Sequence, residues 1–158
     1  MIRRRPFIFI SRSRVAVFAM ALALVWGCHV AVPAQGEDTF GDGADPIKLF
    51  ERGQNAHARG DLVKALEFYD QAIKVRPEFA EAEFQRGSVL TALDRLDEAE
   101  ASLRRSIELR KNWALPYAAL GALLVKRNRA SDAEKVLRDA IKLDPQDNLA
   151  LRLLAGVR

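Results

Sequence analysis

Cysteine and histidine are almost absent from this chain of 158 residues. It contains one cysteine, Cys28, and two histidines, of which only His57 lies beyond residue 34. A single thiol cannot form an internal disulfide, and no cluster of Cys and His ligands or cysteine nucleophile with a histidine partner can be assembled beyond residue 34. Paired acids such as Asp97 and Glu98 stand among Lys and Arg residues, as on a solvated helix surface. We therefore expect no enzymatic activity, no cofactor and no metal site.

Acidic residues are missing from the start of the chain. No Asp or Glu precedes Glu37, whereas five arginines stand within the first 14 positions. An apolar run over residues 15–26 comes next, and small residues lead up to Ala34. A basic segment, an apolar segment and a small-residue site, in that order, predict a secretory signal peptide over residues 1–34 with cleavage after Ala34.

Three alternatives to simple cleavage stay open. Cys28 follows Gly27 as in a lipoprotein signal, although the bulky Trp26 is unusual there. The apolar stretch approaches the length of an uncleaved membrane anchor if it continues to Val32, and a mitochondrial presequence fits less well because the apolar block is continuous. In the signal, lipoprotein and anchor cases the positive charge stays inside the cell. We therefore expect the remainder outside the cytoplasm, secreted or periplasmic, with membrane tethering as the alternative.

The charge balance changes once this segment is set aside. The chain has 25 Lys and Arg against 21 Asp and Glu, and five of the arginines lie before residue 35, which leaves 20 against 21. The basic character belongs to the targeting segment, so a nucleic-acid partner is not expected. Residues 35–45 are rich in glycine and acids and predict a flexible linker. Asp45 followed by Pro46 predicts a helix start.

A repeat of 34 residues occupies most of the chain beyond residue 45. Glycine recurs as Gly53, Gly87 and Gly121, and Ala155 falls on the fourth beat. Twelve residues after each glycine stand Ala65, Ala99 and Ala133, followed by a large residue, a small residue and isoleucine at helical spacing. A fixed period of this size predicts a solenoid in which each unit is one pair of amphipathic helices.

This frame resembles the tetratricopeptide repeat, although Glu83 replaces a large residue, Arg52 and Arg86 stand where leucine is usual, and Lys111 replaces proline. The resemblance implies an all-α, right-handed α-solenoid of three helix pairs, over residues 46–79, 80–113 and 114–147. Residues 148–158 predict a short C-terminal capping helix. We expect the repeated glycines and alanines to serve close packing between the two helices of a unit.

The resemblance also implies a concave groove lined by the first helix of each unit. Its predicted residues fall into four rows, which are Phe50, Phe84 and Ala118; Gln54, Ser88 and Ala122; His57, Thr91 and Val125; and Ile47, Glu81 and Leu115. Two interpretations of the phenylalanines stay open. They anchor a partner peptide, with Gln54 and Ser88 bonding its backbone, or they pack against neighbouring helices of the fold.

Two further expectations concern partners. The family members that grip acidic chaperone tails use charged and amide residues at positions that here hold Phe50, Gln54, Gln85, Leu115 and Ala119, so that clamp is absent. In the last helix, Leu149 and Leu153 are expected to face away from the third unit. Two interpretations stay open: they offer a surface to another chain, such as a second copy, or they are tolerated leucines of a short frayed helix.

We therefore interpret the chain as a non-catalytic scaffold that binds a protein or peptide outside the cytoplasm. The alternative is an accessory subunit of an envelope enzyme or assembly machine, tethered as a lipoprotein through Cys28.

Overall fold

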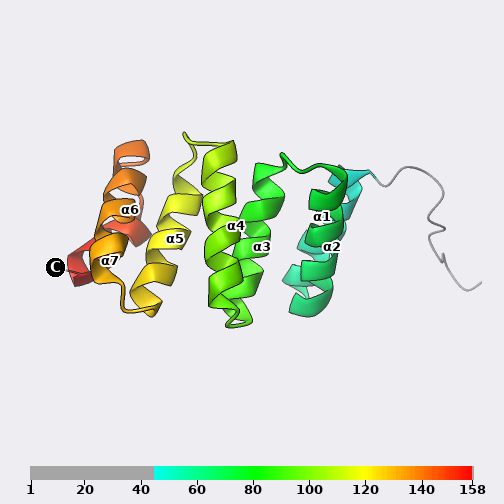
Figure 1. Ribbon diagram of the computed structural model, residues 1–158, viewed down its shortest axis with the longest axis horizontal. Helices are drawn as coiled ribbons and strands as arrows, with labels where there is room; N and C mark the ends of the chain where they lie inside the picture. The colour runs from blue at the N-terminus through cyan, green and yellow to red at the C-terminus, as the bar shows by residue number, and fades with distance from the viewer. Residues whose placement is uncertain (1–44, 158) are drawn as a thin grey trace, which may run out of the picture. The chain divides into compact units, whose positions relative to one another are not determined.

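The computed structural model describes residues 45–157, and this part of the chain contains seven helices and no strand. The signal segment with Cys28 and nearly all of the predicted linker lie outside the described residues. The helices follow one another in a row, from α1 and α2 at one end to α6 and α7 at the other (Figure 1). Their bounds are α1 Pro46–Ala58, α2 Leu62–Val75, α3 Ala80–Ala92, α4 Leu96–Leu109, α5 Ala114–Lys126, α6 Ala130–Leu143 and α7 Asn148–Val157.

The helix ends follow from local chemistry. Asp45 caps α1, since its side chain accepts a hydrogen bond from the backbone N–H of Ile47 at 2.9 Å, and Pro46 occupies the first turn as predicted. Between the two helices of each unit, Gly60, Asp94 and Asn128 adopt positive φ angles of 79°, 61° and 55°. These residue types tolerate the left-handed conformation that ends a helix. The same turn conformation thus follows the first helix in all three units.

The repeated glycines bring the two helices of a unit into close contact. A Cβ atom added at Gly53 would lie 2.5 Å from the ring of Tyr69, and one at Gly87 would lie 2.8 Å from Leu103 Cγ. Gly121 meets Leu137 in the same way. The partners Ala65, Ala99 and Ala133 are completely buried. These small residues lie where the two helices of a unit touch.

The apolar core runs along the array between first and second helices, where one large cluster joins buried side chains from α1 to α7. Within the described residues, none of the helices has the length and apolarity needed to span a bilayer. Each first helix packs against the second helix of its own unit, and each second helix packs against the next first helix.

Candidate partner-binding groove

The predicted binding surface lies on the first helices. α3 contacts α5 and α5 contacts α7, whereas α2, α4 and α6 make no comparable contact with one another in the described part of the chain. Because the first helices approach one another more closely than the second helices do, the array curves toward them. We call their inward-curving face, made by α1, α3 and α5, the groove.

The groove residues differ in exposure. Gln54 is exposed, and Leu115 and Ile47 are each 53% exposed. The prediction for Ala118 is wrong, because it is only 2% exposed and belongs to the core cluster. Its methyl group is too short to emerge between the larger side chains around it. The other predicted residues are half-buried, namely Phe50, His57, Glu81, Phe84, Ser88, Thr91, Ala122 and Val125.

Both phenylalanines take part in the packing of the fold. The ring of Phe50 lies 5.8 Å from that of Tyr69 and 5.0 Å from that of Phe79, and the ring of Phe84 lies 4.9 Å from that of Trp113. Such ring pairs are stabilising beyond the area they bury. The structure therefore favours the second interpretation, packing within the fold, and leaves only part of each ring at the surface.

This aromatic packing is itself a repeated feature. Phe79 and Trp113 stand 34 residues apart, just before α3 and α5. The guanidinium carbons of Arg76 and Arg110, again one repeat apart, lie 4.9 Å and 5.1 Å from the centres of these rings. Each stack joins the end of a unit to the first helix of the same unit. The sequence contains the signal for it, an arginine three residues before an aromatic, in two successive units.

The hydroxyl groups of the groove residues Ser88 and Thr91 form hydrogen bonds with the backbone of their own helix. Ser88 Oγ donates to the carbonyl of Phe84 at 3.0 Å, and Thr91 Oγ1 donates to the carbonyl of Gly87 at 2.8 Å. Such bonds to the preceding turn are common for these residues in helices. Ser88 and Thr91 therefore face a partner mainly as hydrogen-bond acceptors.

An open depression of about 410 Å³ lies at the α1 end of the groove. Gln54, His57 and Ala58 of α1 line it together with Tyr69 of α2 and Gln85 of α3. Tyr69 is fully buried, its hydroxyl has no hydrogen-bond partner among the described residues, and burial raises the pKa of Tyr69 to about 12. Gln85 and Tyr69 were not among the predicted groove residues, because the four rows did not include their repeat positions.

Two charged side chains beside the groove, Glu81 and Arg86, form ion pairs with residues outside α3. Glu81 accepts from Arg110 at 2.8 Å. Burial raises the pKa of Glu83, and nearby Arg86 and Arg105 oppose that rise. Arg86 also donates to Asp70 of α2 at 2.6 Å. The repeat usually has apolar residues at the positions of Glu83 and Arg86. These two charged side chains lie next to each other.

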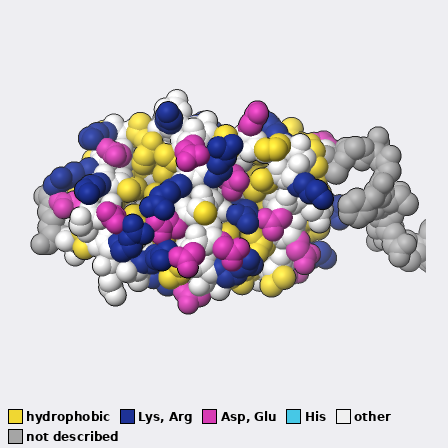
Figure 2. All heavy atoms as spheres, viewed as in Figure 1, with side chains coloured by type: hydrophobic (Ala, Val, Ile, Leu, Met, Phe, Trp, Pro, Cys, Tyr) yellow, Lys and Arg dark blue, Asp and Glu magenta, His cyan; other side chains and the backbone are white. Residues whose placement is uncertain are grey.

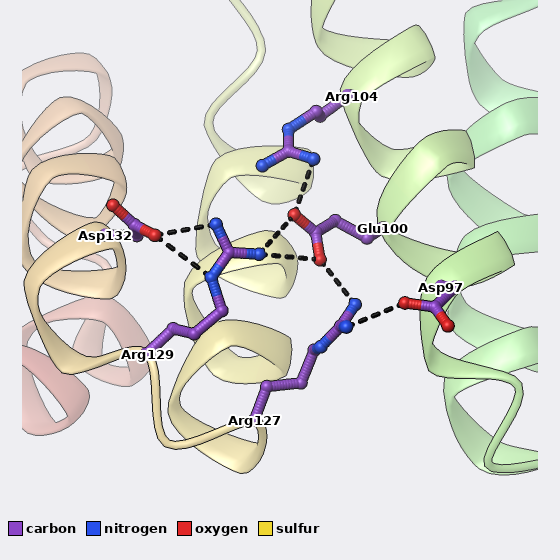
Figure 3. Close-up of polar contacts among 6 residues, drawn as sticks. All are labelled: Asp97, Glu100, Arg104, Arg127, Arg129 and Asp132. Atoms are coloured by element: carbon purple, nitrogen blue, oxygen red, sulfur yellow. Dashed lines mark hydrogen bonds and ion pairs between the residues drawn. The ribbon is translucent and has the colours of Figure 1, made fainter.

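A second charged cluster fixes the third unit to the second (Figure 3). Glu100 of α4, with a side chain only 6% exposed, pairs with Arg127 at 2.7 Å and with Arg129 at 2.8 Å, both from the α5–α6 connection. Arg104 joins from α4 itself. The hydrogen bonds of Arg129 to Asp132 and Glu100 raise the pKa of Arg129. A buried carboxylate with three guanidinium partners holds these helices in register.

Figure 2 shows one face of the molecule, on which Lys and Arg alternate with Asp and Glu and no sign dominates. This agrees with the nearly even charge balance beyond residue 34.

The last helix is placed differently from the prediction. Ala150 is buried, and Leu153 packs against the core cluster, so the expectation that Leu153 faces away from the third unit is wrong. Leu149 is 45% exposed and occupies the same repeat position as Leu115, on the rim of the groove. Leu151 is 42% exposed, because α7 has no second helix of its own to cover it in the described residues. Self-association through this helix stays a prediction.

Comparison with known proteins identifies the architecture. A tetratricopeptide repeat family model matches residues 50–114 and 118–158. The chain belongs to the tetratricopeptide repeat family. A stretch of 63 residues is 30% identical to an uncharacterized protein of Methanocaldococcus jannaschii, and the match covers 40% of this chain and 73% of that protein.

Solved tetratricopeptide domains share the fold. The first such domain of Spaghetti (RPAP3), bound to the HSP90 peptide SRMEEVD, superposes with a TM-score of 0.70 at 20% identity, over 73% of this chain and 92% of that one. The Arabidopsis OM64 domain gives 0.70 at 24% identity, over 72% and 93%. The second domain of human RPAP3, in complex with the HSP70 peptide SGPTIEEVD, gives 0.67 at 19% identity, over 71% and 97%. Tetratricopeptide arrays are protein-interaction scaffolds, and their curved surfaces are where partners bind.

Proposed function

We propose that this tetratricopeptide protein is a non-catalytic scaffold that binds a protein or peptide partner in the groove. The observation that carries the proposal is Leu115, which keeps 53% of its surface exposed on the groove rim although the fold does not need an apolar residue there. Half-buried Ala122 and Val125 continue this apolar surface along α5. Apolar surface on a concave face is typical of a peptide-binding site.

The partner differs in charge from the peptides bound by the structural relatives. The peptides in those complexes, SRMEEVD and SGPTIEEVD, are acidic at their C-terminal ends. The positions that would form an acid-gripping clamp here hold the uncharged residues Phe50, Gln54, Gln85, Leu115 and Ala119. Without cations at these places an acidic tail has no electrostatic partner. The groove is suited to an uncharged segment.

The test compares two alanine-to-arginine variants of the full chain. Ala122→Arg places a long charged side chain in the groove, and Ala101→Arg places the same side chain on an exposed site of α4, away from it. We expect the wild type and Ala101→Arg to capture the same partner from an envelope extract and Ala122→Arg to lose it, with helical content equal in all three. Equal capture by both variants would contradict groove binding. Phe50 and Phe84 are unsuitable for this test, since their rings stabilise the fold.

We also propose that the scaffold acts outside the cytoplasm, tethered or free. The basic and apolar order of residues 1–34 supports this placement. Protease treatment of intact spheroplasts should digest the repeats, whereas a cytoplasmic protein would be protected. Incorporation of labelled fatty acid that is lost in Cys28→Ala would establish the lipoprotein form, and its absence would favour cleavage or an uncleaved anchor.

A further inference from the structure

The depression between α1 and α3 differs from the rest of the groove in the side chains that line it. Its lining combines two carboxamides, Gln54 and Gln85, with the imidazole of His57 and the ring of Tyr69. We propose that it receives an uncharged carboxamide, the side chain of an asparagine or glutamine in the bound peptide. This inference rests on the groove as the binding surface and names what one part of it recognises.

The polar groups of the lining are available to a ligand. Within the part of the chain that the structure describes, the side chains of Gln54, His57 and Gln85 form no hydrogen bond with another residue. Each glutamine offers a carbonyl acceptor and an amino group with two donors. A ligand carboxamide has the same groups, so a pair of complementary hydrogen bonds can form with either glutamine.

Tyr69 adds a fixed donor beneath these flexible side chains. Its ring is held against Gly53 and lies 5.8 Å from the ring of Phe50, so the hydroxyl cannot move far. The hydroxyl is buried and lacks a partner within the described residues. A buried polar group without a partner is destabilising, and it is relieved when a ligand oxygen supplies the missing acceptor. Access to the hydroxyl requires a side chain that lines the depression, such as the exposed Gln54, to move.

Because its lining carries no permanent charge, the depression favours a carboxamide over a carboxylate. None of its five residues carries a permanent charge. The nearest arginine on α3, Arg86, is occupied by Asp70 and by Ser102. A carboxylate in the depression would exchange part of its hydration for neutral groups without gaining a permanent cation from the lining, which is unfavourable. An aliphatic side chain would leave Gln54 and Gln85 unpaired.

The experiment is a selection of random dodecapeptides displayed on phage, carried out on the full-length protein. We expect the selected peptides to share an asparagine or glutamine, with apolar residues on one side of it that lie on α5. In a synthetic copy of one selected peptide, replacing this residue by its acid, Asn→Asp or Gln→Glu, should weaken binding by about tenfold or more. Selection of peptides with an acid at the shared position would overturn the proposal.

Tyr69→Phe gives the sharpest control, since it removes one oxygen and keeps the ring packed on Gly53. We expect it to weaken the same peptide about threefold to tenfold, the range for one hydrogen bond between uncharged groups, while thermal stability stays equal or rises. Gln54→Ala should weaken binding similarly, and Asn55→Ala, one exposed residue further on α1, should not.

The outcomes separate this inference from the groove proposal. Peptides that are blocked by Ala122→Arg but bind equally well to wild type and Tyr69→Phe would overturn the carboxamide site and leave groove binding intact. Failure to select any peptide that Ala122→Arg blocks would overturn both.

Discussion

Replacing Gly87 by alanine is expected to destabilise the array, although alanine is the better helix former. The added Cβ would lie 2.8 Å from Leu103 Cγ, 2.9 Å from Leu103 Cδ2 and 3.3 Å from the carbonyl oxygen of Ala99. The side chain of Leu103 is fully buried and the carbonyl belongs to the backbone of α4, so neither can yield without moving a helix. Overpacking of this kind costs about 1–3 kcal/mol, and the helix propensity of alanine offsets about 1 kcal/mol. We expect a net loss of up to ~2 kcal/mol, measured by urea unfolding followed by circular dichroism.

Gly156→Ala is the matched control. Gly156 lies in α7, is exposed, and has no atom within 4 Å of an added Cβ. Only the propensity effect remains there, so stability should rise by up to ~1 kcal/mol, less if the end of α7 frays. If Gly87→Ala were also stabilising, close helix contact could not be the reason for glycine at this repeat position.

Gly87→Ala in a Leu103→Ala variant tests whether the contact with Leu103 causes the loss of stability. Leu103→Ala removes the side chain that the new methyl group would strike, at a cost of about 2–5 kcal/mol by itself. In that background Gly87→Ala should be neutral or stabilising, because the methyl group fills part of the space. The two substitutions would then be coupled, as expected for residues in direct contact. Additive effects would contradict the packing explanation.

Two predictions concern buried charge. Burial raises the pKa of Glu83, so this carboxyl favours the folded state while protonated, and its contribution is lost as pH rises from the ordinary glutamate value through the raised one. Glu83→Gln should abolish this pH dependence of the free energy of unfolding, measured by urea unfolding across acidic pH. An unchanged pH dependence would refute its assignment to Glu83. Glu100→Gln should destabilise by about 2 kcal/mol in the same assay, because three arginines lose their buried partner. Asp139→Asn, in an exposed pair with Lys142, should have little effect, and equal losses at both sites would refute the cluster's role.

The helical scaffold could be predicted from the sequence because packing within a unit requires particular residue types, and these recur every 34 residues. Gly53 and its equivalents must be small where Tyr69 and its equivalents are large, and Gly60, Asp94 and Asn128 must allow positive φ. These requirements are local to one unit and recur in each, so a single sequence displays them three times. Partner binding imposes no such repeated requirement on residue type.

The groove could be predicted only in part, because exposure depends on residues outside the four predicted rows. Phe50 and Phe84 are covered by Phe79 and Trp113, which come from the connections between units. Leu153 faces the core because α7 packs against α5 and α6 as a first helix does. The depression escaped prediction for the same reason, since Gln85 and Tyr69 approach Gln54 only after the helices pack.

The third unit departs from the first two at the connection to α7. Phe79 and Trp113 precede helices that lack a side-chain cap, whereas Asp147, at the same repeat position, caps α7 by accepting from the N–H groups of Leu149 at 2.9 Å and Ala150 at 3.1 Å. An aspartate cannot cover apolar surface as an aromatic ring does. At the equivalent position α5 correspondingly carries the buried Ala118, where α1 and α3 carry phenylalanine.

The two ends of the groove therefore differ in chemistry. Hydrogen-bonding side chains lie over the first two units, with Gln54, His57 and Gln85 around the depression. Over the third unit and α7, Leu115 and Leu149 occupy equivalent positions on helices in contact and are 53% and 45% exposed. A partner lying along the groove meets two carboxamides beside Ile47, itself 53% exposed, at one end and two leucines at the other. Reversing it would bury polar groups against leucine and leave the glutamines unpaired, so under the proposed function the groove selects the direction of the bound chain as well as its composition.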